Sequence, residues 1–399
     1  MVTSRPLAGC RVVDLTRFVS GAWCTMALSS LGADVVKVEG LPQGDPYREQ
    51  GTSFVDGRSS LFLGLNAGKR SIAVDLRSPE GLAVVERMLA EADVFVENGR
   101  PGSLARLGLD YESVHARHPQ VVYASVSAYG QVGPQASSGG FDLIVQAESG
   151  VMSVTGTTES GPVKVGAPFL DVGAGIACVG AVLAGLLQRQ QTGEGLHVTS
   201  SLLEFAVTGF IGAAATYFED HAEPGLLGSH SPTFAPYGAF RCRDDHLVIA
   251  GAGSEKLWST LCEVLGASEL VDDERFSTNA ERVRHRDELT AVLESHLAAR
   301  DAADWQERLT AAGVPVAQVR TLGQVLESEQ VAALGLVHDL DSGPTSYRTL
   351  GPPFTVGEIL DYPRGAPELG EHTRQVMHDL GWSDEEIDGL SDRGVVLVP

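Results

Sequence analysis

Cysteine is scarce in this chain of 399 residues, which contains five: Cys10, Cys24, Cys178, Cys242 and Cys262. They are far apart, odd in number and without a CxxC pair. The sequence therefore indicates neither a disulfide framework nor a zinc site, and we expect no bound metal.

Positive charge is also in short supply. Lys and Arg together number 29 against 52 Asp and Glu, which gives a formal net charge of −23 at pH 7. Binding to nucleic acid requires basic side chains that displace counterions from the phosphates. This charge balance excludes a nucleic-acid partner, but a small anionic ligand is compatible with it where basic residues converge locally.

Long hydrophobic runs and a targeting segment are not apparent. We find no run of roughly 18 apolar residues, the length that a membrane span needs. The first residues, MVTSRPLAGCRVVDLTRF, lack the basic start, apolar stretch and cleavage site of a signal peptide. We therefore expect a cytoplasmic protein with no membrane partner. Its length and its 43% hydrophobic content suffice for a large core and two domains.

Several familiar catalytic and nucleotide-binding motifs are missing. No GxGxxG follows the first predicted strand, and the chain has no GxSxG, HExxH or Walker loop. The usual support for a dinucleotide-binding enzyme, a serine hydrolase, a zinc protease or a nucleoside triphosphatase is therefore absent.

The first half of the chain alternates short β-branched runs with helical patterns. Strands are expected within residues 10–16, 33–40, 70–76, 93–98 and 120–130, and helices within 21–32 and 78–92. This alternation predicts right-handed crossovers and a mainly parallel sheet. Ser78 is the predicted N-cap of the second helix, with Pro79 at its first position.

The pattern changes in the second half of the chain. Residues 174–189 are small and apolar and predict a buried helix, whereas the segment after Phe218 is rich in Gly, Pro and Ser. A hairpin is expected at 239–253, followed by charged amphipathic helices. We predict an α/β fold with three parts: a large Rossmann-like domain with an open parallel sheet that begins with residues 1–220, a smaller α+β domain at 221–325, and a C-terminal segment at 326–399 that returns to the large domain.

Basic residues recur near the ends of the predicted strands: Lys69, Arg70, Arg77, Arg100 and Arg106. Ligands of open parallel sheets bind at the carboxyl ends of the strands, and arginine holds phosphate groups well. Composition and spacing thus predict an α/β protein with a phosphate-bearing ligand and leave the reaction open.

Seven segments, taken in their order along the chain, carry a more specific signal than composition and spacing. They are LTRFVSGAWCTMALSSLGADVVKVE, NAGKRSIAVDLRSPEG, VENGRPG, GLDYESV, VSAYGQVGP, FDLIVQAESGVMSVTG and GEGLHVTSSLLE. They resemble the class III CoA-transferases, the family of formyl-CoA transferase, carnitine CoA-transferase and α-methylacyl-CoA racemase. The resemblance runs from about residue 7 to the C-terminus. It implies coenzyme A as part of an acyl-CoA substrate, and an interlocked homodimer in which each chain threads through the other.

The resemblance also assigns a role to Asp171 in GAPFLDVGAG. In the transferase branch this residue is the covalent nucleophile, which forms a mixed anhydride and then an aspartyl-CoA thioester before the carboxylic acid acceptor receives CoA. With an ordinary pKa near ~3.9, a carboxylate is ionised at pH 7 and needs no general base. Both intermediates hydrolyse easily, so the site must exclude water.

Contacts to CoA are implied for a wider set of residues. These are Val19, Ser20, Val74, Leu76, Asn98, Gly99, Arg100, Arg106 and Leu107. Of these, Val74 and Leu76 would line the adenine, and Asn98 with Gly99 would lie beside the pantetheine.

The active-site loop of relatives corresponds to the Gly-rich segment 225–232, which contains Gly228 and His230. This loop is expected to cover the site and help exclude water. Backbone amides near Gly173 are expected to stabilise the oxyanion.

Departures from the family pattern bear on the reaction. Phe141 stands where the racemase branch has a proton-carrying His, and Phe cannot move a proton. Val19 replaces a Gln of formyl-CoA transferase, and Gly40 replaces a basic CoA contact. Phe141 and Val19 together favour a monocarboxylic or partly apolar acceptor over oxalate. Two alternatives stay open: a racemase-like enolising enzyme, which would need a second proton carrier near Asp171, and a catalytically silent CoA-binding protein.

Overall fold

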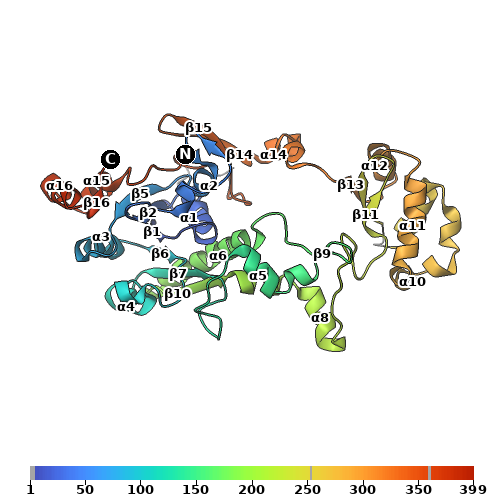
Figure 1. The fold of residues 1–399 in the computed structure, drawn as a ribbon, viewed down its shortest axis with the longest axis horizontal. Coiled ribbons are helices and arrows are strands. Elements are labelled where there is room, and N and C mark those ends of the chain that lie inside the picture. Colours follow the sequence, from blue (N-terminus) through green and yellow to red (C-terminus); the bar gives the residue numbers. More distant parts are fainter. Residues whose placement is uncertain (1–4, 252–253, 358–360) are drawn as a thin grey trace. The chain divides into compact units, whose positions relative to one another are not determined.

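The computed structural model describes residues 5–251, 254–357 and 361–399 (Figure 1). The chain divides into two compact units. Unit 1 comprises Met1–Ser149, Val165–Ile211 and Ser328–Pro399, and unit 2 comprises Gly150–Lys164 and Gly212–Glu327. Compared with the predicted small domain at 221–325, unit 2 also contains residues 150–164, 212–220 and 326–327.

Unit 1 is built on a seven-stranded sheet with the order β10-β7-β6-β1-β2-β5-β16. The strands are β1 (Arg11–Leu15), β2 (Asp34–Gly40), β5 (Arg70–Val74), β6 (Val94–Glu97), β7 (Val122–Ser127), β10 (His197–Ser201) and β16 (Val396–Leu397). β16 pairs antiparallel with β5, whereas the other six strands are parallel to their neighbours. The predicted parallel sheet is thus confirmed. Chain order reverses between β1 and β6, which is where ligands of doubly wound sheets bind.

Helices follow the strands of unit 1 (Figure 1). They are α1 (Ser20–Ser30), α2 (Ser60–Leu65), α3 (Pro79–Ala90), α4 (Tyr111–Arg117), α5 (Asp142–Glu148), α6 (Phe169–Thr192), α7 (Leu202–Thr208), α14 (Glu329–Leu334), α15 (Thr373–Asp379) and α16 (Asp384–Asp392). At the start of α3 the Ser78 side chain accepts from the Gly81 N–H, and Pro79 is the first residue, so the predicted cap is confirmed.

Helix α6 is longer than the predicted 174–189, and it contains Asp171 in its first turn. By length and composition it is the one helix among the described residues that would suffice to cross a membrane, so the expectation of no such run was wrong. In unit 1 it instead packs against α1, β7 and β10. A Cβ at Gly175 would lie 2.6 Å from the Ser20 carbonyl oxygen, so the contact with α1 requires glycine.

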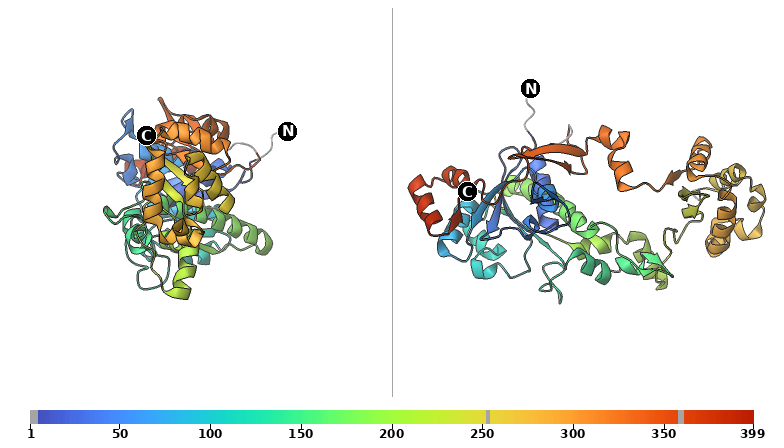
Figure 2. Two further views of the ribbon diagram at one scale, coloured as in Figure 1. Left: turned by 90° about the vertical axis from the view of Figure 1, so that its right-hand side faces the viewer. Right: turned by 45° about the horizontal axis from the view of Figure 1, so that its top comes forward.

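The C-terminal segment adds to unit 1. A hairpin of β14 (Val337–Ser342) and β15 (Thr345–Leu350) packs on α2, where Phe62, Leu63 and Tyr347 share a small core. Farther along the chain, α15 packs on β5 and β16 joins the edge of the sheet. Figure 2 shows this segment in orange to red beside the blue N-terminal strands.

Unit 2 has its own core, built around Trp258, Phe276 and Trp305. Its elements are β8 (Gly156–Thr157), β9 (Gly161–Pro162), α8 (Ile211–Asp220), β11 (Tyr237–Arg241), β12 (His246–Ala250), α9 (Glu255–Leu265), α10 (Asn279–Arg284), α11 (Arg286–Leu297), α12 (Ala302–Ala311), β13 (Val316–Gln318) and α13 (Leu322–Leu326). The predicted hairpin at 239–253 corresponds to β11–β12, and residues 252–253 of that range lie outside the described residues. Residues 150–164 belong here because the Gly228 N–H donates to the Gly156 carbonyl oxygen at 2.7 Å.

Candidate functional site

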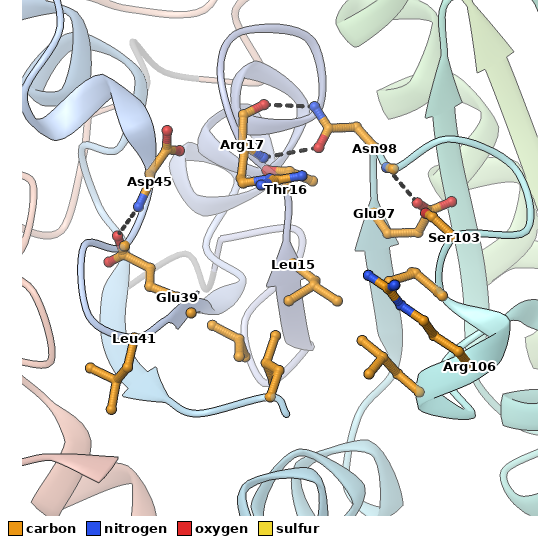
Figure 3. Close-up of a pocket in the computed structure, with 17 residues that line it drawn as sticks. Leu15, Thr16, Arg17, Glu39, Leu41, Asp45, Glu97, Asn98, Ser103 and Arg106 are labelled. Atoms are coloured by element: carbon orange, nitrogen blue, oxygen red, sulfur yellow. Dashed lines mark hydrogen bonds between the residues drawn. The ribbon is translucent and has the colours of Figure 1, made fainter. Parts of the chain in front are cut away.

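A cavity of about 350 Å³ opens at the carboxyl ends of β1, β2 and β6, where the chain order of the sheet reverses (Figure 3). Its lining includes Leu15–Arg17, Val38–Leu41 and Glu97–Gly99 from the ends of these strands. The segment after β6 contributes Arg106 and Leu107. We call this space the switch-point cavity.

A second cavity, of about 340 Å³, contains Asp171 in its lining. Tyr47, Arg100 and Phe141 line it as well, and so does the start of α1 at Ser20. Arg17, Asn98 and Gly99 line both this space and the switch-point cavity, so the two adjoin. We call the second space the Asp171 cavity.

The predicted site residues form groups according to the cavity that they line. Leu76, Arg106 and Leu107 line the switch-point cavity; Ser20, Arg100, Phe141 and Asp171 line the Asp171 cavity; Asn98 and Gly99 line both. Val19 is buried as the N-cap of α1, and Val74 is enclosed in the core, so neither lines these cavities.

Gly228 and His230 lie in unit 2 and are not among the described residues that line either cavity. The His230 ring packs edge-on against Phe240 with 5.4 Å between centroids. Burial, followed by the charge of Arg286, lowers the pKa of His230. These contacts give His230 a packing role within unit 2.

Asn98 fixes the loop between β1 and α1 (Figure 3). Its Oδ1 accepts from the Arg17 N–H at 2.9 Å, and its Nδ2 donates to the Arg17 carbonyl oxygen at 2.6 Å. The next residue, Phe18, has a φ of 62°, a conformation that a non-glycine residue adopts only where its surroundings hold it. The loop shared by the two cavities is therefore held in one geometry.

Two acidic residues in the lining of the switch-point cavity are paired with cations. Glu39 accepts from Arg48 at 2.6 Å, and Asp45 lies 3.0 Å from the ammonium group of the fully buried Lys37. Burial opposes the charge of Glu39, but the hydrogen bonds and charge of Arg48 keep its pKa below the ordinary value. Glu97 is buried without such a cation, and burial raises its pKa to about 7. The acidic charge facing a bound anion is thereby reduced.

Of the basic residues noted near strand ends, Lys69 and Arg70 do not reach a ligand site. They stand at the amino end of β5, away from the cavities. Lys69 is fully buried 3.0 Å from Asp14, and Arg70 pairs with Asp34 and with Asp379 at 2.8 Å. Their interpretation as ligand-binding residues was wrong, because both cations are already paired with carboxylates of the protein.

Arg77 is exposed and pairs with Asp75 at 2.8 Å. The guanidinium groups of Arg17, Arg100 and Arg106 have, within the described residues, neither a hydrogen-bond acceptor nor an ion-pair partner. These three arginines line the cavities and are the ones available to an anionic ligand.

Asp171 stands in the first turn of α6, and Asp142 on α5 caps that turn. The carboxylate oxygen Oδ2 of Asp142 accepts from the N–H groups of Leu170, at 2.8 Å, and of Asp171, at 3.2 Å. Gln146, also on α5, is fully buried and donates to the other oxygen of Asp142. The amides of Leu170 and Asp171 are therefore occupied by Asp142, whereas the oxyanion contact expected from amides near Gly173 stays a prediction.

The environment of Asp171 makes its carboxylate less acidic than we expected from sequence. Burial raises its pKa to about 7, and the charge of Asp142 contributes to the rise. Tyr47 is close enough that the charge of Asp171, after burial, raises the tyrosine pKa. The ordinary pKa assumed for Asp171 was therefore wrong, and a substantial fraction of this carboxyl group is protonated at neutral pH.

Sequence reasoning missed Arg17, Tyr47 and Asp142. Asp142 directly follows Phe141 and opens a helix, which is a position where an acidic side chain often meets backbone amides. Arg17 follows a predicted strand at its carboxyl end, which was the criterion applied to the other arginines. We find no comparable local signal for Tyr47.

Removal of the Asp142 charge is expected to shift the pH dependence of any reaction that needs ionised Asp171. Ionisation of Asp171 requires a pH above its raised pKa, so the rate should rise with pH through about 7 in the wild type. In Asp142→Asn the like charge is gone, and the acid limb of kcat/KM should move lower by about 1 pH unit or more. Glu148→Gln removes a charge from the far end of α5 and should leave the limb in place. If the acid limb of kcat/KM lies at the same pH in Asp142→Asn and in the wild type, this explanation is contradicted.

Comparisons with known proteins agree on one family. The family model of CoA-transferase family III matches residues 7–373. Succinyl-CoA:glutarate CoA-transferase of Mus musculus is 36% identical over 98% of this chain and 90% of its own. Succinate–glutarate CoA-transferase of Agrobacterium fabrum is also 36% identical, over 94% of this chain and 96% of its own. A CAIB/BAIF family protein from Brucella suis has a TM-score of 0.84 at 35% identity and covers 95% of this chain and 100% of its own.

Proposed function

The chain belongs to CoA-transferase family III, and from this premise we propose that it transfers CoA from an acyl-CoA thioester to a carboxylic acid through Asp171. The observation that carries the proposal is the place of Asp171 in a cavity that adjoins the ligand-binding edge of the sheet. The similarity to CoA-transferases that act on carboxylic acids supports the same reaction class.

An acyl-CoA molecule would extend through both cavities. Its nucleotide end would occupy the switch-point cavity, where Arg106 offers an unpaired guanidinium to phosphate. The pantetheine would pass Asn98 and Gly99, which line both spaces. This placement brings the thioester next to Asp171, so the two reacting groups are held together rather than meeting by diffusion.

The Asp171 carboxylate then attacks the thioester carbonyl, which forms a mixed anhydride and releases the CoA thiolate. The thiolate returns to the aspartyl carbonyl, releases the donor acid and leaves an aspartyl-CoA thioester. The acceptor acid reverses these steps and departs with CoA. For the oxyanion, the start of α1 is the better candidate, because Ser20 lines the cavity and the helix has no side-chain cap.

The racemase-like alternative finds little support at this site. Phe141 is 66% exposed, and its ring lies edge-on to Phe18 at 5.9 Å between centroids, with no group that could carry a proton. The titratable side chains that line the cavity with Asp171 are Tyr47, Arg17 and Arg100. Burial raises the pKa of Tyr47, and arginine stays protonated, so neither is suited to abstract a proton at neutral pH.

A homodimer is part of the proposal because α6 leaves apolar surface uncovered. Of the apolar window in this helix, 44% is buried within one chain. Phe169, Ile176 and Leu187 on α6 are exposed, and so is Val207 on α7. Apolar surface of this extent marks an interface, and a second copy of the chain, as in the interlocked dimers of the family, would cover it.

The covalent intermediate provides the test. Incubation of the enzyme with an acyl-CoA donor and no acceptor should leave a fraction of Asp171 as an acyl or CoA adduct, since the reaction cannot finish. Hydroxylamine should convert the aspartyl carbonyl to a hydroxamate and borohydride should reduce it to an alcohol, each with a defined mass change. Peptide mass spectrometry should place both changes on VGAPFLDVGAG. An unmodified peptide from an enzyme that is active in transfer would exclude the covalent route.

A further inference from the structure

The Asp171 cavity contains a hydrogen-bond donor that the protein leaves unused, the hydroxyl group of Tyr47. The tyrosine side chain is half-buried and lines the cavity together with Asp171. Within the described residues its hydroxyl group forms no hydrogen bond, and burial and the charge of Asp142, not a bond from Tyr47, set the pKa of Asp171. A donor beside a reactive carboxylate, without a partner in the protein, is free to bind an atom of the substrate.

The Tyr47 hydroxyl group is also close to the nucleophile and keeps its proton there. Both residues line one cavity of about 340 Å³. After burial, the charge of Asp171 is the largest cause that raises the pKa of Tyr47 above its ordinary value. A phenol with an ordinary pKa near ~10 is protonated at neutral pH, and the rise makes it more so. Tyr47 is therefore a donor over the whole pH range in which Asp171 becomes ionised.

The position of Tyr47 is fixed through its backbone and through its ring. Its N–H donates to the carboxylate of Asp45 at 3.0 Å, and Asp45 lies 3.0 Å from the buried ammonium group of Lys37. The ring packs edge-on against Phe18, with 5.3 Å between centroids and 89° between planes. The donor is thus held in place before a substrate binds, which is the condition under which a hydrogen bond to a developing charge accelerates a reaction.

The proposed reaction creates negative charge at one atom of this cavity, the carbonyl oxygen of the thioester. When an oxygen of Asp171 forms a bond to the carbonyl carbon, the π-electron pair of the carbonyl group moves to its oxygen. The pair returns as the C–S bond breaks, and the thiolate leaves with the bonding electrons. The amide at the start of α1 would supply one hydrogen bond to this oxyanion, which has lone pairs for a second donor.

We propose that Tyr47 is a further catalytic residue, whose hydroxyl group donates a hydrogen bond to the thioester carbonyl oxygen while Asp171 attacks the carbonyl carbon. The inference rests on the proposed function and adds a side-chain donor to its oxyanion site. Tyr47 keeps its proton throughout the step, so it stabilises charge without acting as a general acid, and the thiolate leaves unprotonated.

Tyr47→Phe tests the kinetic role, because it keeps the ring and removes the hydroxyl group. With a saturating acyl-CoA donor, kcat should fall about 100-fold, as expected for the loss of one oxyanion donor. The Kd for CoA, measured by isothermal titration calorimetry, should change by less than about threefold. Since the ionisation of Asp171 is not altered, the acid limb of kcat/KM should stay near pH 7.

The matched control is Tyr111→Phe, which should transfer CoA at the wild-type rate. Tyr111 is also half-buried, and its ring stacks on His197 with 4.6 Å between centroids. It is not among the described residues that line either cavity. The two substitutions therefore remove the same group from two tyrosines, only one of which lies beside Asp171.

Infrared spectroscopy tests the contact itself. In Asp171→Ala the donor binds but does not react, so the stretching band of an isotope-labelled thioester carbonyl is observed in the intact cavity. A hydrogen bond polarises the carbonyl group and lowers the wavenumber of this band. Adding Tyr47→Phe should raise the wavenumber, whereas adding Tyr111→Phe should leave it in place.

Two results would overturn this inference while transfer through Asp171 stands: a loss of kcat below about threefold in Tyr47→Phe, or a carbonyl band that does not move. An acid limb displaced to higher pH, with the full rate recovered above it, would overturn it as well, because Tyr47 would then act by stabilising the Asp171 carboxylate. A wild type that transfers CoA to no carboxylic acid, or that transfers it with an unmodified Asp171 peptide, would overturn the proposed function and this inference together.

Discussion

Asp171→Asn is expected to abolish CoA transfer, with kcat reduced at least about 10⁴-fold. The amide occupies nearly the same volume as the carboxylate but cannot attack a thioester. CoA affinity should change by less than about threefold, because the residues that line the switch-point cavity are not altered. Steady-state kinetics would measure the first effect and isothermal titration calorimetry the second.

Arg106→Gln should show the reverse behaviour, weaker CoA binding with transfer retained at saturating donor. Asp171→Ala is the control for slow deamidation of the introduced asparagine to aspartate, because alanine cannot regenerate a carboxylate. Transfer by both Asp171 variants within about tenfold of the wild type would show that another group is the nucleophile. Loss of CoA binding together with transfer would show instead that Asp171 supports the cavity rather than the covalent step.

The sheet could be predicted because its signal is local. β-branched runs such as those at β1, β2 and β5 are bounded by turn residues, and their alternation with helices implies parallel pairing. The start of α6 could not be predicted in this way. Its first turn is stabilised by Asp142, which is 28 residues before Leu170 in sequence, and a local pattern contains no trace of such a partner.

The candidate site, like the fold, could be predicted from the sequence only in part. The family resemblance supplied Asp171, Asn98 and Gly99, which the structure places in the lining of the two cavities. The criterion of a cation near a strand end was less selective, because it does not distinguish the two ends of a strand or reveal a buried partner. The pKa of Asp171 was beyond sequence reasoning for a similar reason, since burial and the nearby Asp142 are both products of the tertiary fold.

Lys69, which we had interpreted as a ligand-binding residue, has a structural role in a buried ion pair. Its ammonium group donates to Asp14 at 3.0 Å, to the Ala22 carbonyl oxygen at 3.0 Å and to Asn66 at 2.8 Å. These partners come from β1, from α1 and from the end of α2. Asp14 in turn accepts from the Thr16 and Thr25 hydroxyl groups at 2.6 and 2.7 Å. The buried ion pair therefore connects the elements that support the start of α1 and the loop between β1 and α1, which contains Arg17.

Lys69→Met should lower the free energy of unfolding by about 3–5 kcal/mol, because removal of one partner leaves the buried charge of Asp14 undercompensated. Urea denaturation would measure the loss, with Lys256→Met as the control, since Lys256 is exposed. Adding Asp14→Asn to Lys69→Met removes the uncompensated charge and keeps an oxygen for the threonine hydroxyl groups, so the double variant should regain part of the stability. A Lys69→Met protein as stable as Lys256→Met would mean that Lys37, also fully buried and close to Asp14, satisfies the carboxylate alone.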